Sequence, residues 1–93
     1  MPHAAIVTVD IAAGRFDSAQ KVLINEIVPR ISKAPGFIKG YWTVRGDKTQ
    51  GLSIIVFDSK QNAEAAAQTA RNSPTPPGVK LNNVDIGEVV AEA

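Results

Sequence analysis

Three side chains of this sequence, His3, Asn25 and Trp42, could do chemistry or hold a ligand. His3 is the only histidine, and it could act as a general base because the pKa of an unperturbed imidazole lies near neutrality. Trp42 is the only tryptophan and could stack on a planar ligand. Asn25 could present its amide where Pro29 would kink a helix. We therefore treat all three as candidate catalytic residues, and Asn25 and Trp42 also as candidate ligand-binding residues.

Each candidate also has a simpler explanation. His3 could be an exposed residue at the start of a strand, Trp42 could pack in a core or an interface, and Asn25 could be a solvated helix residue. Arg45, at a strand end, could hold an anion but equally could be a free surface side chain. With no cysteine and a single histidine, the chain predicts no metal site of its own. No glycine-rich phosphate loop follows a strand, and we expect no cofactor.

The composition is that of an ordinary globular domain. Hydrophobic residues make up 44% of the chain and charged residues 20%, with a formal net charge of +1. That balance predicts neither a nucleic-acid partner nor an anionic membrane. No apolar run approaches the roughly 20 residues of a membrane span, and the first residues lack the basic start of a signal peptide. We expect one domain over residues 1–93, located in the cytoplasm.

The hydrophobic pattern predicts four strands and two helices in the order βαββαβ. Strands are expected at residues 4–10, 37–44, 51–57 and 79–90, and helices at residues 18–33 and 60–70. Asp17 is expected to cap the first helix, and Pro29 to kink it. In the second strand, simple alternation places Phe37 on the same face as Tyr41. Right-handed crossovers put both helices on one face of a four-stranded antiparallel sheet, an α+β, ferredoxin-like fold.

The third strand is apolar on both faces, although a sheet with one wet face should alternate apolar and polar residues. One face carries Leu52, Ile54 and Val56, and the other carries Ser53, Ile55 and Phe57. The helices can cover only one of these faces, and a monomer rarely exposes a large apolar patch. RNA-binding sheets use stacking aromatic residues, whereas this face is aliphatic. A second copy is therefore the expected cover, with Leu52, Ile54 and Val56 in a homodimer interface.

Short motifs add a family resemblance. They are Val28-Pro29-Arg30 late in the first helix, Ala34-Pro35-Gly36-Phe37 after it, and Val56-Phe57-Asp58-Ser59 followed by Ala63. With the element order, they make the chain resemble the dimeric α/β-barrel superfamily, which includes antibiotic-biosynthesis-monooxygenase-like and stress-responsive barrel proteins. The resemblance implies two sheets paired in a dimeric barrel and a cavity between each sheet and its helices.

The same resemblance bears on chemistry. Cofactor-independent monooxygenases of the superfamily commonly use a tryptophan, an asparagine and a histidine. At the end of the third strand they have a tryptophan where this chain has Phe57, which we take as a third candidate ligand-binding residue. No histidine follows the second helix of this chain, so the family's pattern is incomplete here.

Two functional hypotheses follow. The first is a small homodimeric barrel protein that binds a small apolar or aromatic ligand between sheet and helices, with monooxygenase-like activity as an extension. The alternative is a non-catalytic dimeric structural or interaction module without an open pocket. A cavity bordered by Trp42 or Asn25 would favour the first hypothesis, and a filled interior would favour the second.

Overall fold

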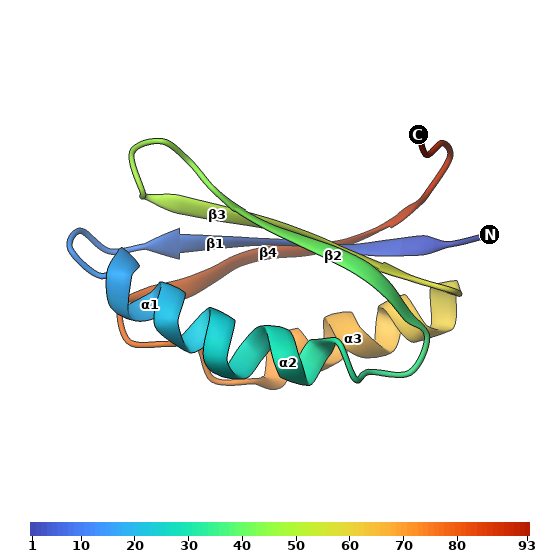
Figure 1. Cartoon of the computed structure of the whole chain (residues 1–93), viewed down its shortest axis with the longest axis horizontal. Helices are drawn as coiled ribbons and strands as arrows, with labels where there is room; N and C mark the ends of the chain where they lie inside the picture. The colour runs from blue at the N-terminus through green and yellow to red at the C-terminus, as the bar shows by residue number, and fades with distance from the viewer.

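Four antiparallel strands form one sheet in the computed structural model, which describes all 93 residues of the chain. The strands are β1 (His3–Ile11), β2 (Phe37–Val44), β3 (Gln50–Phe57) and β4 (Val79–Glu88), in the spatial order β2-β3-β1-β4. The helical segments are α1 (Phe16–Val22), η1 (Leu23–Ile27), α2 (Val28–Ile31) and α3 (Lys60–Asn72). All of them lie on one side of the sheet (Figure 1). The predicted α+β, ferredoxin-like fold is confirmed.

Strand β3 lies between β1 and β2, and its two faces divide as alternation predicts. Ile55 and Phe57 face the helices and are buried. Leu52 and Ile54 lie on the other, open face and are 41% and 39% exposed. The division holds because a slip of one residue would bring Ser53 and Ile55 to the open face and exchange every buried side chain.

Val56 shares the open face but is only 6% exposed. Residues beyond β4 rise on this side of the sheet (Figure 1), where the Val89 N–H donates to the Pro2 carbonyl oxygen and Glu92 lies 3.8 Å from the Lys39 ammonium. Lys39 is the β2 partner of Val56, so the end of the chain shields this end of the open face. Of the predicted interface residues, Leu52 and Ile54 are thus open, and Val56 is already covered.

A bulge in β2 overturns the expected placement of Phe37. Phe37 pairs with Phe57, but Lys39 pairs with Val56, so Ile38 is an extra residue in the strand. A bulge of this kind changes the face on which the preceding residues lie. Phe37 therefore faces the helices and meets Phe57 edge to face, with ring centroids 6.2 Å apart. Tyr41 lies on the open face with Ile54, and the prediction that it shares a face with Phe37 was wrong.

The first helical stretch begins two residues earlier than predicted and contains a π-helical turn. Arg15, not Asp17, holds the capping position, and it makes no side-chain capping bond. Asp17 instead lies in the first turn, where a carboxylate is favourable near the positive end of the helix dipole. Just before Pro29, the Val28 N–H donates to the Leu23 carbonyl oxygen, five residues back. The irregularity expected at Pro29 thus takes the form of the π turn η1.

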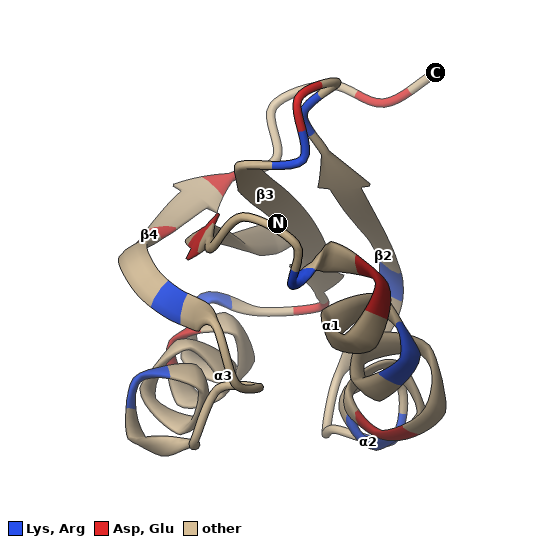
Figure 2. Ribbon diagram, turned by 90° about the vertical axis from the view of Figure 1, so that its left-hand side faces the viewer, with Lys and Arg blue, Asp and Glu red and all other residues tan.

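The two helical stretches that cover the sheet approach it differently. Ala63 and Ala67 of α3 are buried against the sheet because their small side chains let the helix lie close to it. The first helical stretch carries larger residues such as Leu23 and Ile27, and its backbone comes less close to the strands than that of α3 does. The two helical stretches lie side by side on the same side of the sheet (Figure 2). Only side chains can therefore fill the space between the first stretch and the sheet. None of the helices combines the length and apolar character needed to cross a membrane.

Candidate functional site

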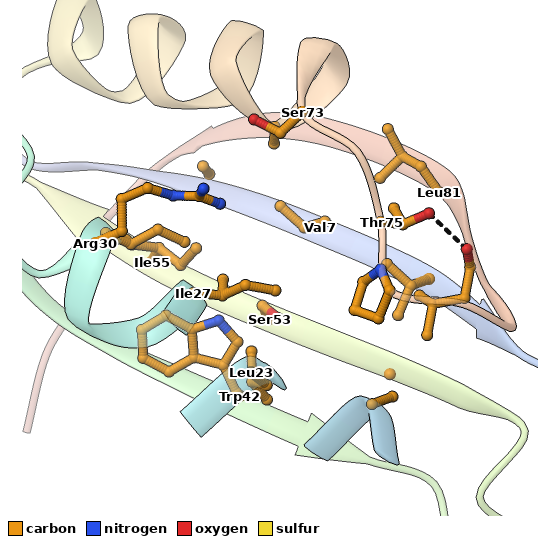
Figure 3. Close-up of a pocket in the computed structure, with 18 of the residues that line it drawn as sticks. Val7, Leu23, Ile27, Arg30, Trp42, Ser53, Ile55, Ser73, Thr75 and Leu81 are labelled. Carbon is orange, nitrogen blue, oxygen red and sulfur yellow. Dashed lines mark hydrogen bonds between the residues drawn. The ribbon is translucent and has the colours of Figure 1, made fainter. Parts of the chain in front are cut away.

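A cavity of about 350 Å³ lies between the helix-facing side of the sheet and the helical layer. Most of its walls are apolar. Val7, Leu23, Ile27, Trp42, Ile55 and Leu81 are among the lining residues (Figure 3). The loop of residues 73–76 after α3 closes part of the rim. The interior beside Trp42 is therefore not filled, which is the condition set above for the pocket hypothesis.

Small residues explain why the cavity exists. Ser53 lies on its floor in β3, flanked by Val7 of β1 and Trp42 of β2. A serine there leaves the volume that a leucine or phenylalanine would occupy in a packed core. The Ser53 side chain forms no hydrogen bond within the chain and is half-buried. Its hydroxyl is thus a free polar group on an apolar floor.

Trp42 borders the cavity in a position that depends on Gly40. The two residues share the helix-facing side of β2, and the indole lies back over the α-carbon of Gly40. A methyl group built on Gly40 would lie 2.6 Å from Cη2 and 2.8 Å from Cζ3 of the indole, far closer than van der Waals contact allows. Any larger residue at position 40 would displace the Trp42 ring.

Arg30 is the only ionisable side chain in the cavity lining. It extends from α2 into the space bordered by Ile27, Ile55 and Trp42 (Figure 3). Arg30 was not singled out as a site residue from the sequence. The spacing of residues could have identified it. Leu23, Ile27 and Arg30 follow one another at four and three residues and so share one face of a helix.

Of the sequence-predicted site residues, only Trp42 borders the cavity. Asn25 is exposed on η1, outside the lining. His3 begins β1, where its Nδ1 lies 3.0 Å from the Met1 carbonyl oxygen, and it also lies outside the lining. Phe57 is fully buried, packed on Phe37 behind the cavity wall. The structure therefore does not bring a tryptophan, an asparagine and a histidine together.

The chemistry available in the cavity is that of hydrogen-bond donors on an apolar surface. Its lining contains no histidine, aspartate, glutamate or tyrosine, so no side chain there is suited to act as a general base near neutral pH. No group of three or more potential metal-ligating histidine, cysteine, aspartate or glutamate side chains is present. The site is consequently suited to binding and orienting an apolar molecule.

Arg45 and Asp47 lie in the β2–β3 hairpin. Hydrogen bonds from the Thr49 hydroxyl and backbone N–H, followed by the nearby Arg45 charge, lower the pKa of the Asp47 carboxyl. Arg45 Nε lies 4.0 Å from Asp47 Oδ1. Arg45 thus has a carboxylate partner within its own turn, which accounts for its position without an external anion.

Comparison with known proteins identifies the fold. No protein-family model matches the sequence, and no curated protein matches it. Solved structures do match. A Chloroflexus aurantiacus protein provisionally named an antibiotic biosynthesis monooxygenase has a TM-score of 0.68 at 18% identity, covering 100% of this chain and 97% of its own. The chain described here therefore has the ferredoxin-like fold of the antibiotic-biosynthesis-monooxygenase-like proteins.

Two further structures share that fold. The monooxygenase from the ActVA-Orf6 gene of Streptomyces coelicolor, in complex with Nanaomycin D, has a TM-score of 0.62 at 14% identity and covers 98% of this chain and 90% of its own. A dimeric ferredoxin-like protein from an uncultured marine organism has a TM-score of 0.63 at 15% identity and covers 100% and 98%. At such identities the similarity shows the fold alone.

Proposed function

We propose that the protein is a homodimer in which each protomer binds a small, largely apolar ring compound between its sheet and its helices. The observation that carries this proposal is the apolar cavity bordered by Trp42. Its volume of about 350 Å³ lies within the range of roughly 300–1,000 Å³ typical of small-molecule sites. The indole offers a flat surface on which an aromatic ligand can pack.

The surface of the protomer supports the dimer. A monomer of 9.8 kDa has an accessible surface of about 5,200 Å² by the usual scaling, whereas this chain exposes 5953 Å². The chain thus exposes more surface than a compact monomer of its mass. Tyr41, Leu52 and Ile54 are exposed large side chains on the open face, and that face is where we place the second copy.

In this proposal, dimer assembly and ligand binding use opposite faces of the sheet. The open face carries Leu52 and Ile54, whereas Ser53 and Ile55, between and beside them in β3, line the cavity. Val7, Trp42, Ser53 and Ile55 of the lining lie on the helix-facing side of the sheet, away from the open face. The proposed dimer therefore has two independent sites, and each protomer should bind one ligand.

A fluorescence titration tests the proposed site. Trp42 is the only tryptophan, so its emission reports on the cavity wall. Methylnaphthoquinone, a neutral ring compound that quenches indole, should quench it saturably with one site per protomer. Ser53→Leu should abolish the saturable part by filling the floor, while Ser18→Leu, on an exposed helix position, should not. Quenching that rises linearly and equally in all three proteins would contradict the proposal.

Cofactor-independent oxygenation is a second candidate, supported by the shared fold with the S. coelicolor monooxygenase and by Trp42 in the lining. Because the lining supplies no general base, a substrate would have to lose its proton without one. Oxygen uptake with a dihydroxynaphthalene, faster with protein than with the Ser53→Leu variant, would support this candidate. Equal uptake would leave binding as the function.

A cytoplasmic location belongs to the same proposal. It is supported by the absence of cysteine, which is compatible with a reducing compartment. In an oxidising compartment, a chain without cysteine could form no disulfide to stabilise its fold.

A further inference from the structure

The hydrogen-bonding groups in the cavity lining fall into two sets. In the first set, the hydroxyls of Thr43, Thr69, Ser73 and Thr75 already donate to backbone carbonyl oxygens. In the second set, the side chains of Gln20, Arg30, Trp42 and Ser53 form no hydrogen bond or ion pair within the chain. All four can donate, and two of them, Arg30 and the Trp42 indole, can only donate. The free groups therefore match a ligand that presents acceptors.

Arg30 decides which kind of acceptor fits best. The three ion pairs of the chain join Lys39 to Glu92, Arg45 to Asp47 and Lys60 to Glu64. None of them involves Arg30, and no carboxylate lines the cavity. Arg30 thus has no ion-pair partner within the chain, and it is an exposed residue at the edge of the cavity.

Because Arg30 is exposed, water screens its charge, and a preference for an anion must come mainly from the geometry of its hydrogen bonds. The planar guanidinium can donate two parallel hydrogen bonds to one carboxylate, or to an ionised phenol or enol through fewer bonds. A neutral hydrocarbon would make contact only with the apolar walls, and the hydrogen-bond donors would remain bonded to water.

We propose that the pocket selects ring compounds that carry one anionic oxygen group, and that Arg30 binds this group while the rings lie against Trp42 and Ile55. This inference rests on the proposed ligand-binding function and narrows its ligand class. The anionic group is a carboxylate or an ionised phenol or enol, because each presents an oxygen with negative charge at the edge of a flat apolar body.

Naphthoate and naphthamide test the proposal because they share ring and shape and differ in charge. Calorimetric titration should show naphthoate binding at least tenfold more tightly than naphthamide, with one site per protomer. Arg30→Gln should remove most of that preference by weakening naphthoate binding far more than naphthamide binding, and Arg30→Lys should keep part of it. Lys21→Gln removes the same charge from the same helical stretch outside the lining, and it should keep the preference.

Three results would overturn the inference. Equal affinity for naphthoate and naphthamide would refute anion selection but leave the pocket intact. An equal loss in Arg30→Gln and Lys21→Gln would assign the preference to long-range charge, not to Arg30. Failure of both compounds to bind the folded dimer would instead refute the proposed function itself. Circular dichroism of each variant confirms that it is folded.

Discussion

Gly40 and Trp42 occupy adjacent positions on the helix-facing side of β2, and the indole of Trp42 covers the bare α-carbon of Gly40. The glycine is what allows the indole to lie along the strand and leave the cavity open. Had position 40 carried a side chain, the ring would have to turn away from the strand and toward the cavity. Gly40 is thus a positioning residue for the site, although it does not line it.

Gly40→Ala should therefore shift the Trp42 ring and weaken ligand binding. Overpacking of this kind costs about 1–3 kcal/mol, which chemical denaturation would measure, and the emission maximum of the single tryptophan should change. In a Trp42→Phe background the added methyl group should cost clearly less, because the shorter ring does not reach it. An identical cost in both backgrounds would show that the two residues are not coupled.

Ile54→Asp should dissociate the proposed dimer. It places a carboxylate in the centre of the open face, where burial against a second copy would leave the charge without a partner. Light scattering should give the mass of one protomer for this variant and twice that mass for the unmodified chain. Ile24→Asp, at a position 57% exposed on η1 and so on the helix side of the sheet, is the matched control and should stay dimeric. If Ile54→Asp still had the mass of two protomers, the interface would lie elsewhere on the chain.

Ala67→Leu should destabilise the fold because α3 packs closely on the sheet. Ala67 is 1% exposed, so three further carbon atoms would push the helix away or strain its side chains. The expected loss is about 1–3 kcal/mol in the free energy of unfolding. Ala65→Leu makes the same change on the exposed side of the helix and should stay within roughly 0.5 kcal/mol of the parent. Similar losses in both would mean that the close packing of α3 is not the cause.

His3→Ala and Asn25→Ala should leave ligand affinity unchanged. Neither side chain lines the cavity, although residue type alone made both candidates for catalysis. Trp42→Ala, which removes an aromatic wall, should lower the affinity for naphthoate by at least tenfold in a calorimetric titration. A loss in Asn25→Ala as large as that in Trp42→Ala would instead assign binding to the exposed face of η1.

The sequence predicted the fold well because its strongest signals are periodic. In β3, successive residues alternate between two apolar faces, and a slip of one residue would turn both Ile55 and Phe57 to the open face. The phase of β2 could not be read in the same way. Its bulge at Ile38 follows from pairing with β3, and no glycine or proline at that position marks it.

The site was less predictable because a cavity is a property of packing. Ser53 lines it only because of its neighbours Val7 and Trp42 on adjacent strands, and those pairings are not visible in one strand's sequence. A search by residue type selected His3 and Asn25, which lie elsewhere. Arg30 was present in the Val28-Pro29-Arg30 motif, but its unpaired charge emerges only from the positions of all the carboxylates.

An NMR titration of isotope-labelled protein with naphthoate tests the central claim most directly, because the two faces of the sheet report separately. We predict saturable shifts at the Trp42 indole N–H and at the backbone amides of Val7 and Ser53, with Tyr41 and Leu52 changing little. Shifts concentrated on Tyr41 and Leu52, or none at Trp42, would contradict a ligand site between the sheet and the helices.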